Sequence, residues 1–281
     1  MAVTALEIKS RQTFAQGIEF GDRGSYQQLD GTVYFSVDPN APANRFITDL
    51  KLTPKDGHGL VAFSADFRMI RPTDPSRGNH RLFFDILNRG RGPVLRNINS
   101  APDVAASEPL NPGNGFLMRE GYTVAYCGWQ HDAPDVLGSM RLYGPDAVMP
   151  DGPVSGKIVI TLQLNAPSQV EFLSNRMHRA YPTVDPQDPD AVLTEQDDED
   201  AQERVIPRDQ WSFSRPEDGQ AVTDASYVNY PSGFIPGKVY QVIYTTSTAP
   251  IVGLGLLATR DCGSFLRYGT AQQGNPCDGD I

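Results

Sequence analysis

The 281-residue sequence has little cysteine and a deficit of positive charge. Three cysteines, Cys127, Cys262 and Cys277, are an odd number at wide spacings, which excludes a disulfide framework, and no two form a Cys-x-x-Cys metal pair. Lysine and arginine total 24 against 34 aspartates and glutamates. The resulting net charge of -10 opposes binding to nucleic acid and to anionic membrane surfaces.

Long apolar runs are also lacking. No stretch reaches the roughly 18 apolar residues of a transmembrane helix. Residues 1–20 contain no run of the roughly seven apolar residues found in a secretory signal. We therefore expect a cytoplasmic protein with no nucleic-acid partner and no membrane partner.

Two apolar runs each lead into a loop that contains glycine. Residues 82–93 read LFFDILNRGRGP, and residues 121–132 read GYTVAYCGWQHD. Both patterns predict a buried strand followed by a loop. Between them, residues 116–120 predict a short helix that stops at Gly121, where a positive φ is often required. This order permits the two strands to lie parallel, as in an α/β sheet.

Other segments predict antiparallel strands and one longer helix. Residues 157–164 place large apolar side chains at even positions, and residues 238–244 also alternate. Residues 251–268 carry an apolar stripe with approximate helical spacing, formed by Leu254, Leu257, Ala258, Phe265 and Leu266. We interpret Arg260 and Asp261 within this helix as a structural charged pair.

Six segments follow one another in a distinctive order: 31–39 (GTVYFSVDP), 44–52 (NRFITDLKL), 60–67 (LVAFSADF), 88–90 (NRG), 121–132 and 253–268 (GLGLLATRDCGSFLRY). This order resembles the N-terminal half of proteins of the α/β-hydrolase-domain family. The resemblance implies an α/β fold, namely an incomplete α/β-hydrolase sheet with a large β-rich insertion, strand-rich overall and with few helices. The implied divisions are 1–150 for the leading strands and strand-loop-helix units, 151–245 for the insertion, and 246–281 for a helix and tail before a nucleophile strand.

The family's nucleophile motif, Gly-x-Ser-x-Gly, does not occur in the sequence. The resemblance implies carboxylic ester hydrolysis with a small ester as substrate in the complete protein. We expect this chain to be an N-terminal portion of such a serine hydrolase, inactive alone and prone to self-association. The alternative is a non-catalytic, β-rich binding module.

Candidate site residues follow the two buried strands. By the resemblance, the backbone N–H groups of Gly90 and Arg91 contribute to an oxyanion hole, beside Asn88 as a substrate contact. A simple strand-to-helix turn would use the same residues. Trp129, Gln130 and Asp132 are candidates for substrate binding at a strand end, although core packing explains Trp129 equally well.

The acidic segment 185–203 contains nine carboxylates and three nearby prolines, and we expect a poorly ordered, solvated loop. Calcium binding is the alternative, with ligands at Asp185, Asp188 and Asp190. The segment contains no glycine and lacks EF-hand spacing. The histidines do not form an i, i+4 pair for zinc: His58, His80, His131 and His178. We therefore predict no metal and no cofactor.

Overall fold

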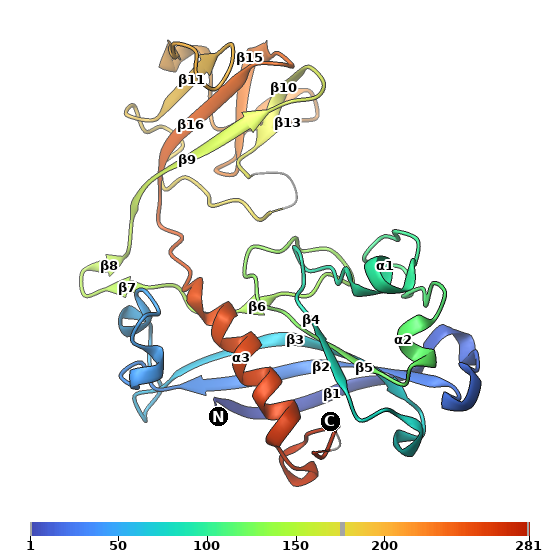
Figure 1. Ribbon diagram of the computed structural model, residues 1–281. Coiled ribbons are helices and arrows are strands. Elements are labelled where there is room, and N and C mark those ends of the chain that lie inside the picture. Colours follow the sequence, from blue (N-terminus) through green and yellow to red (C-terminus); the bar gives the residue numbers. More distant parts are fainter. Residues whose placement is uncertain (1, 175–177, 280) are drawn as a thin grey trace. The chain divides into compact units, whose positions relative to one another are not determined.

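A computed structural model describes residues 2–174, 178–279 and 281. The chain forms two compact units (Figure 1). The first combines Met1–Ala147 with Pro250–Ile281, and the second is Val148–Ala249. The insertion expected at 151–245 falls within the second unit. Each unit has a hydrophobic core of its own.

The first unit is built on a six-stranded sheet with the order β1-β2-β3-β5-β4, in which β6 also pairs with β3. Only β4 and β5 run parallel among its described pairs, and the others are antiparallel. The strands are β1 (Val3–Thr13), β2 (Tyr26–Val37), β3 (Val61–Pro72), β4 (Leu82–Asp85), β5 (Thr123–Cys127) and β6 (Leu142–Tyr143). The α-helices are α1 (Val94–Asn99), α2 (Phe116–Arg119) and α3 (Gly253–Tyr268).

Side chains alternate across this sheet, so its two faces contact different helices. On β5, Val124 and Tyr126 join the core that includes buried residues of α1 and α2. Cys127 faces the other way and contacts Cys262 of α3. The predicted apolar stripe of α3 is confirmed as its buried side, and both cysteines are buried and unbridged. Gly121, which follows α2, has a φ of 80°, and this agrees with the positive φ expected where that helix ends.

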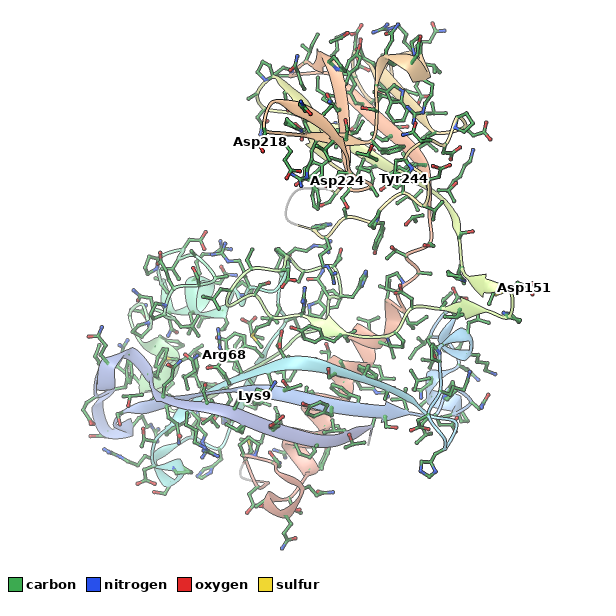
Figure 2. The ribbon with its side chains drawn as sticks, turned by 180° about the vertical axis from the view of Figure 1, so that it is seen from behind. Lys9, Arg68, Asp151, Asp218, Asp224 and Tyr244 are labelled. Atoms are coloured by element: carbon green, nitrogen blue, oxygen red, sulfur yellow. The ribbon has the colours of Figure 1, made fainter. Side chains whose placement is uncertain are left out.

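The second unit is made of antiparallel pairs. Its largest sheet has the order β12-β11-β16-β9, and β10 pairs with β15, β13 with β14, and β7 with β8. Tyr240, Val242 and Tyr244 of β16 are fully buried in its core, and Figure 2 marks Tyr244. The strands are β7 (Val148–Met149), β8 (Gly152–Pro153), β9 (Gly156–Gln163), β10 (Ser168–Phe172), β11 (Val192–Gln196), β12 (Arg204–Ile206), β13 (Ser214–Glu217), β14 (Gln220–Thr223), β15 (Tyr227–Phe234) and β16 (Val239–Thr246).

The expected α/β fold, an incomplete α/β-hydrolase sheet, is wrong. Strands account for 37% of the chain and helices for 17%, and several sheets are antiparallel instead of alternating with helices. The long pairing of β2 with β3 runs from Tyr26↔Pro72 to Val37↔Val61 and dominates the first sheet. The sequence suggested an α/β fold because its most distinctive motifs, residues 82–93 and 121–132, contain β4 and β5. These two strands form the only parallel pair among the described strands.

The acidic segment 185–203 is also more ordered than its composition predicted. Strand β11 runs through it, with Leu193, Glu195 and Gln196 buried between β12 and β16. The carboxylate of Glu195 binds Lys238 at 2.8 Å and Arg204 at 3.0 Å, which compensates for its burial. Partners supplied by distant strands therefore order a segment that has few apolar residues of its own.

Among the described helices, none combines the length and the apolar character needed to cross a membrane.

Candidate functional site

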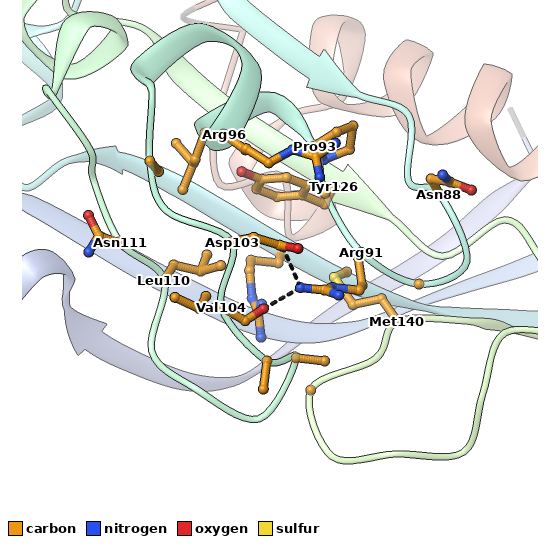
Figure 3. A pocket seen from close by; sticks show the side chains of 18 of the residues that line it. Asn88, Arg91, Pro93, Arg96, Asp103, Val104, Leu110, Asn111, Tyr126 and Met140 are labelled. Carbon is orange, nitrogen blue, oxygen red and sulfur yellow. Dashed lines mark hydrogen bonds and ion pairs between the residues drawn. The ribbon is translucent and has the colours of Figure 1, made fainter. Parts of the chain in front are cut away.

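A cavity of about 200 Å³ lies in the first unit, beside the carboxyl ends of β4 and β5 (Figure 3). The segment that follows β4 forms much of its wall, and the loop that follows β5 contributes Gly138 and Met140. Its apolar lining comes mainly from Leu95, Ala101, Val104, Leu110 and Met140. The polar lining includes three arginines, two asparagines, one aspartate and the hydroxyl-bearing Tyr126.

Residues 88–91 form a tight turn at the edge of this cavity. Asn88 and Arg91 exchange backbone hydrogen bonds, with N···O distances of 2.8 and 3.1 Å. The two central residues have positive φ, 51° for Arg89 and 81° for Gly90. An ideal Cβ on Gly90 would lie 2.1 Å from Ser139 Oγ, so the turn requires glycine there.

Three of the predicted site residues, Asn88, Gly90 and Arg91, therefore line one cavity. The Arg91 N–H donates to the Asn88 carbonyl, so the turn itself uses one of the two N–H groups expected in an oxyanion hole. The Arg91 guanidinium binds Asp103 at 2.8 Å and the Val104 carbonyl, as the dashed lines in Figure 3 show. Both contacts tie the turn to the opposite wall of the cavity.

The other three predicted residues, Trp129, Gln130 and Asp132, do not line the cavity but contact Arg89 of the turn or Leu87 just before it. Trp129 Nε1 donates to the Leu87 carbonyl at 2.6 Å. Gln130 Oε1 accepts the Arg89 N–H at 2.7 Å, and Asp132 binds the Arg89 guanidinium at 2.5 Å. Their role in the described structure is to hold the wall of the cavity in place.

The polar floor of the cavity consists of Arg68 and Tyr126, which no local sequence motif marks as site residues. They are direct partners in the pairing of β3 with β5, so their side chains share one face of the sheet. Within the described structure, the buried hydroxyl of Tyr126 has no hydrogen-bond partner. Arg68 binds Asp30 through Nε at 2.5 Å.

Asp85 supports the cavity from beneath the loop. Its carboxylate is buried and accepts the Val94 N–H at 2.9 Å. Gly92 lies above it, and a Cβ there would come within 2.3 Å of the Tyr126 ring and 3.0 Å of the Asp85 carboxylate. Burial raises the pKa of Asp85 to about 6. The hydrogen bonds from the Val94 and Ile86 backbone lower this pKa, but by less than burial raises it.

The same environment affects Tyr126. Burial raises the pKa of its hydroxyl far above the ordinary value, and the charge of Asp85 raises it further, while Arg68 lowers it. The hydroxyl therefore stays protonated and acts as a hydrogen-bond donor across the physiological pH range. The floor therefore combines a protonated hydroxyl with the Arg68 guanidinium, both from residues that line the cavity.

No protein-family model matches this chain, and neither does a curated protein or a solved structure.

Neither floor residue stands out in the sequence by itself. Arg68 follows Phe67 in a strand that otherwise places apolar residues inward, and Tyr126 sits within the apolar run before Cys127. Only the pairing of β3 with β5 brings the two together.

Within the described part of the chain, no three His, Cys, Asp or Glu side chains converge in the way that metal ligands would.

Proposed function

We propose that the cavity of the first unit binds a small carboxylic ester through its carbonyl oxygen, and that this chain alone does not hydrolyse it. The observation that carries the proposal is the polar floor, where Arg68 and Tyr126 lie side by side and the buried Tyr126 hydroxyl has no hydrogen-bond partner among the described residues. A buried hydroxyl without a partner costs free energy that a ligand oxygen would recover.

The apolar walls suit the acyl chain of such an ester. Leu95, Leu110 and Met140 line the cavity together with several alanines and prolines. Pockets for drug-sized ligands usually measure roughly 300–1,000 Å³, and a cavity of about 200 Å³ favours a smaller molecule.

Binding without hydrolysis is supported by what lines the cavity. Among the described lining residues there is no serine, threonine, cysteine or histidine, so the usual pairing of a nucleophile with its base is not present at the ligand. One site can therefore bind an ester, as the sequence resemblance suggests, without hydrolysing it, as in the non-catalytic alternative.

The test combines a binding experiment with an activity assay. Saturation-transfer NMR should detect methyl butyrate bound to the protein, and Arg68→Lys, which keeps a cation beside Asp30 but loses the planar fork of donors, should weaken binding about fivefold. Arg11→Lys, at an exposed position of β1, is the matched control.

In parallel, the folded protein should cleave p-nitrophenyl acetate no faster than denatured protein does. Turnover abolished by a serine-directed phosphonate would disprove the non-catalytic role. Equal saturation transfer in the wild type and in Arg68→Lys would disprove the carbonyl site.

A further inference from the structure

Much of the cavity lining belongs to one continuous segment that is neither helix nor strand. Residues 101–106, together with Leu110 and Asn111, line the cavity and lie between α1 and α2 in the chain (Figure 3). From residue 102 to residue 114 none of the side chains is buried. A segment with so little buried surface separates from the rest of a protein at a much lower free-energy cost than the core does.

Both ends of this segment are fixed at Asn99, the last residue of α1. Asn99 is fully buried, its carbonyl accepts the Asn114 N–H at 2.7 Å, and its side chain donates to the Pro112 carbonyl at 3.0 Å. Ser100 and Gly113 have positive φ, 53° and 58°. The chain from Ser100 to Gly113 is therefore an Ω-loop, a surface loop whose ends meet, and loops of this kind frequently carry function.

Arg91 holds the Ω-loop by its first half. The Arg91 guanidinium donates to the Asp103 carboxylate at 2.8 Å and to the Val104 carbonyl. The two charged side chains are 47% and 64% exposed, so their ion pair is weak. Among the described residues, no other hydrogen bond or ion pair joins residues 102–110 to the rest of the chain.

The middle of the Ω-loop packs on the loop that follows β5. An ideal Cβ on Gly138 would lie 1.8 Å from the Ala106 carbonyl oxygen, so the two backbones are in close contact. Met140, two residues further along, is buried and lines the cavity. Movement of the Ω-loop away from Gly138 would open this part of the lining to solvent.

We propose that residues 100–113 are a lid on the cavity, which opens about its two fixed ends to admit a ligand and is held closed by Arg91. Arg91 acts here as a positioning residue, through its contacts with Asp103 and Val104. The inference rests on the proposed function for the identity of the ligand, a small ester. Opening itself is measured without any ligand, so the two proposals can fail separately.

Oxidation of methionine reports the opening of the lid. The oxidant is tert-butyl hydroperoxide, a neutral and bulky molecule that transfers one oxygen atom to an accessible methionine sulfur and leaves as tert-butanol. Met118 is fully buried in the core beside the cavity, whereas Met149 is exposed. Peptide mass spectrometry should show that Met140 is oxidised more slowly than Met149 and faster than Met118.

Asp103→Asn weakens the contact with Arg91 and keeps the shape of the side chain. It should raise the oxidation rate of Met140 about twofold to fivefold, the range expected for loss of an exposed ion pair, and leave Met118 protected. Glu108→Gln is the matched control, because it removes a charge from an exposed position of the same Ω-loop that is not bonded to Arg91. Salt at about 0.5 M should raise the rate in the wild type and have little effect in Asp103→Asn.

Gly138→Ala tests the contact at the middle of the lid. The new methyl group would meet the Ala106 carbonyl and hold the lid away from the loop after β5, so Met140 should be oxidised faster than in Asp103→Asn. Circular dichroism and continued protection of Met118 show that the variant is folded.

Three results would contradict the lid. They are equal Met140 oxidation in Asp103→Asn and Glu108→Gln, an unchanged rate in folded Gly138→Ala, and oxidation of Met118 in step with Met140, which would mean general unfolding. Methyl butyrate should slow the oxidation of Met140 in the wild type. If the variants behave as expected but methyl butyrate gives no protection, the lid is supported and the proposed ester-binding function is wrong.

Discussion

Arg68 and Tyr126 lie directly opposite one another on β3 and β5, and both line the same cavity. Buried polar groups in folded proteins nearly always have partners. The buried Tyr126 hydroxyl, which has no partner among the described residues and lies beside an arginine that lines the same cavity, therefore indicates a binding function. The first prediction follows from this pairing: a change at Tyr126 should weaken ligand binding without lowering the stability of the fold.

Tyr126→Phe should weaken ester binding about fivefold, since one hydrogen bond contributes about 1 kcal/mol. It should not lower the free energy of unfolding, and a gain of up to about 1 kcal/mol is expected, because the lost hydroxyl has no partner in the described structure. Urea denaturation and NMR titration measure the two effects.

Tyr26→Phe is the matched control for that change. The Tyr26 hydroxyl is also fully buried, but it donates to the Met118 carbonyl at 2.9 Å. Its loss leaves that carbonyl unpaired and should cost about 1–2 kcal/mol of stability without a specific effect on the ligand. If Tyr126→Phe destabilises the protein as much as Tyr26→Phe, the Tyr126 hydroxyl has a structural role.

The second prediction concerns the turn at the cavity wall. Gly90→Ala should cost about 1–3 kcal/mol of stability, because Gly90 has a φ of 81° and the new methyl group would meet Ser139 Oγ at 2.1 Å. Thermal denaturation compares it with Gly57→Ala, whose Cβ meets no atom within 4 Å. Equal stability of the two variants would show that the turn at 88–91 tolerates a side chain.

The third prediction compares two glycines of α3, Gly263 and Gly255, by the space that a new Cβ would have at each. Gly263→Ala should stabilise the protein by about 0.5–1 kcal/mol, since nothing lies within 4 Å of its Cβ and alanine favours a helix. Gly255→Ala should be strongly destabilising, since its Cβ would lie 1.9 Å from the Trp129 carbonyl. A Gly255→Ala variant as stable as the wild type would mean that α3 does not pack closely against the loop after β5.

Local patterns predicted several elements because the relevant signal lies within a few residues. The alternation in 157–164 is confirmed by β9, where Ile158, Ile160 and Leu162 face the core of the second unit. The helix before Gly121 is present as α2, and Arg260 and Asp261 form an ion pair at 2.6 Å.

What the sequence could not supply was pairing between distant segments. The sheet of the first unit depends on β2 pairing with β3, between partners 24 to 46 residues apart in the sequence, and on β5, which follows β4 in the chain, lying between β3 and β4 in the sheet. Asn88 and Gly90 were selected because a turn next to a strand has a local signature. Arg68 and Tyr126 were not, since each alone reads as an ordinary strand residue, and only the register between strands makes them a site.

The fourth prediction is concentration-dependent self-association through β4. Within the described structure β4 pairs only with β5, which leaves its outer edge without a strand partner, and Ile86 directly after it is half exposed. Sedimentation velocity should show reversible association that Ile86→Lys reduces. Val205→Lys places the same charge at an exposed position of β12 in the second unit and should have little effect. Equal effects of both changes would indicate general charge repulsion instead of edge pairing.

The fifth prediction is a pH dependence that arises from Asp85. Burial raises the pKa of its carboxyl from 3.8 to about 6 in the folded state, so the folded protein binds this proton more tightly than the unfolded chain does. Ionised Asp85 therefore destabilises the fold above about pH 6. This penalty decreases as the pH falls through 6 and is absent below about 4, where the carboxyl is protonated in both states.

Asp85→Asn removes the charge but keeps an oxygen that can accept the Val94 N–H. At pH 7.5 the variant should be more stable than the wild type by an amount on the order of 2 kcal/mol, and near pH 4 the two should be equally stable. Urea denaturation at several pH values measures the difference, with exposed Asp22→Asn as the control that should show no such trend. If Asp85→Asn is less stable than the wild type at pH 7.5, the ionised carboxylate is favoured by its hydrogen bonds from Val94 and Ile86 over the cost of its burial, and the loop above the cavity depends on that charge.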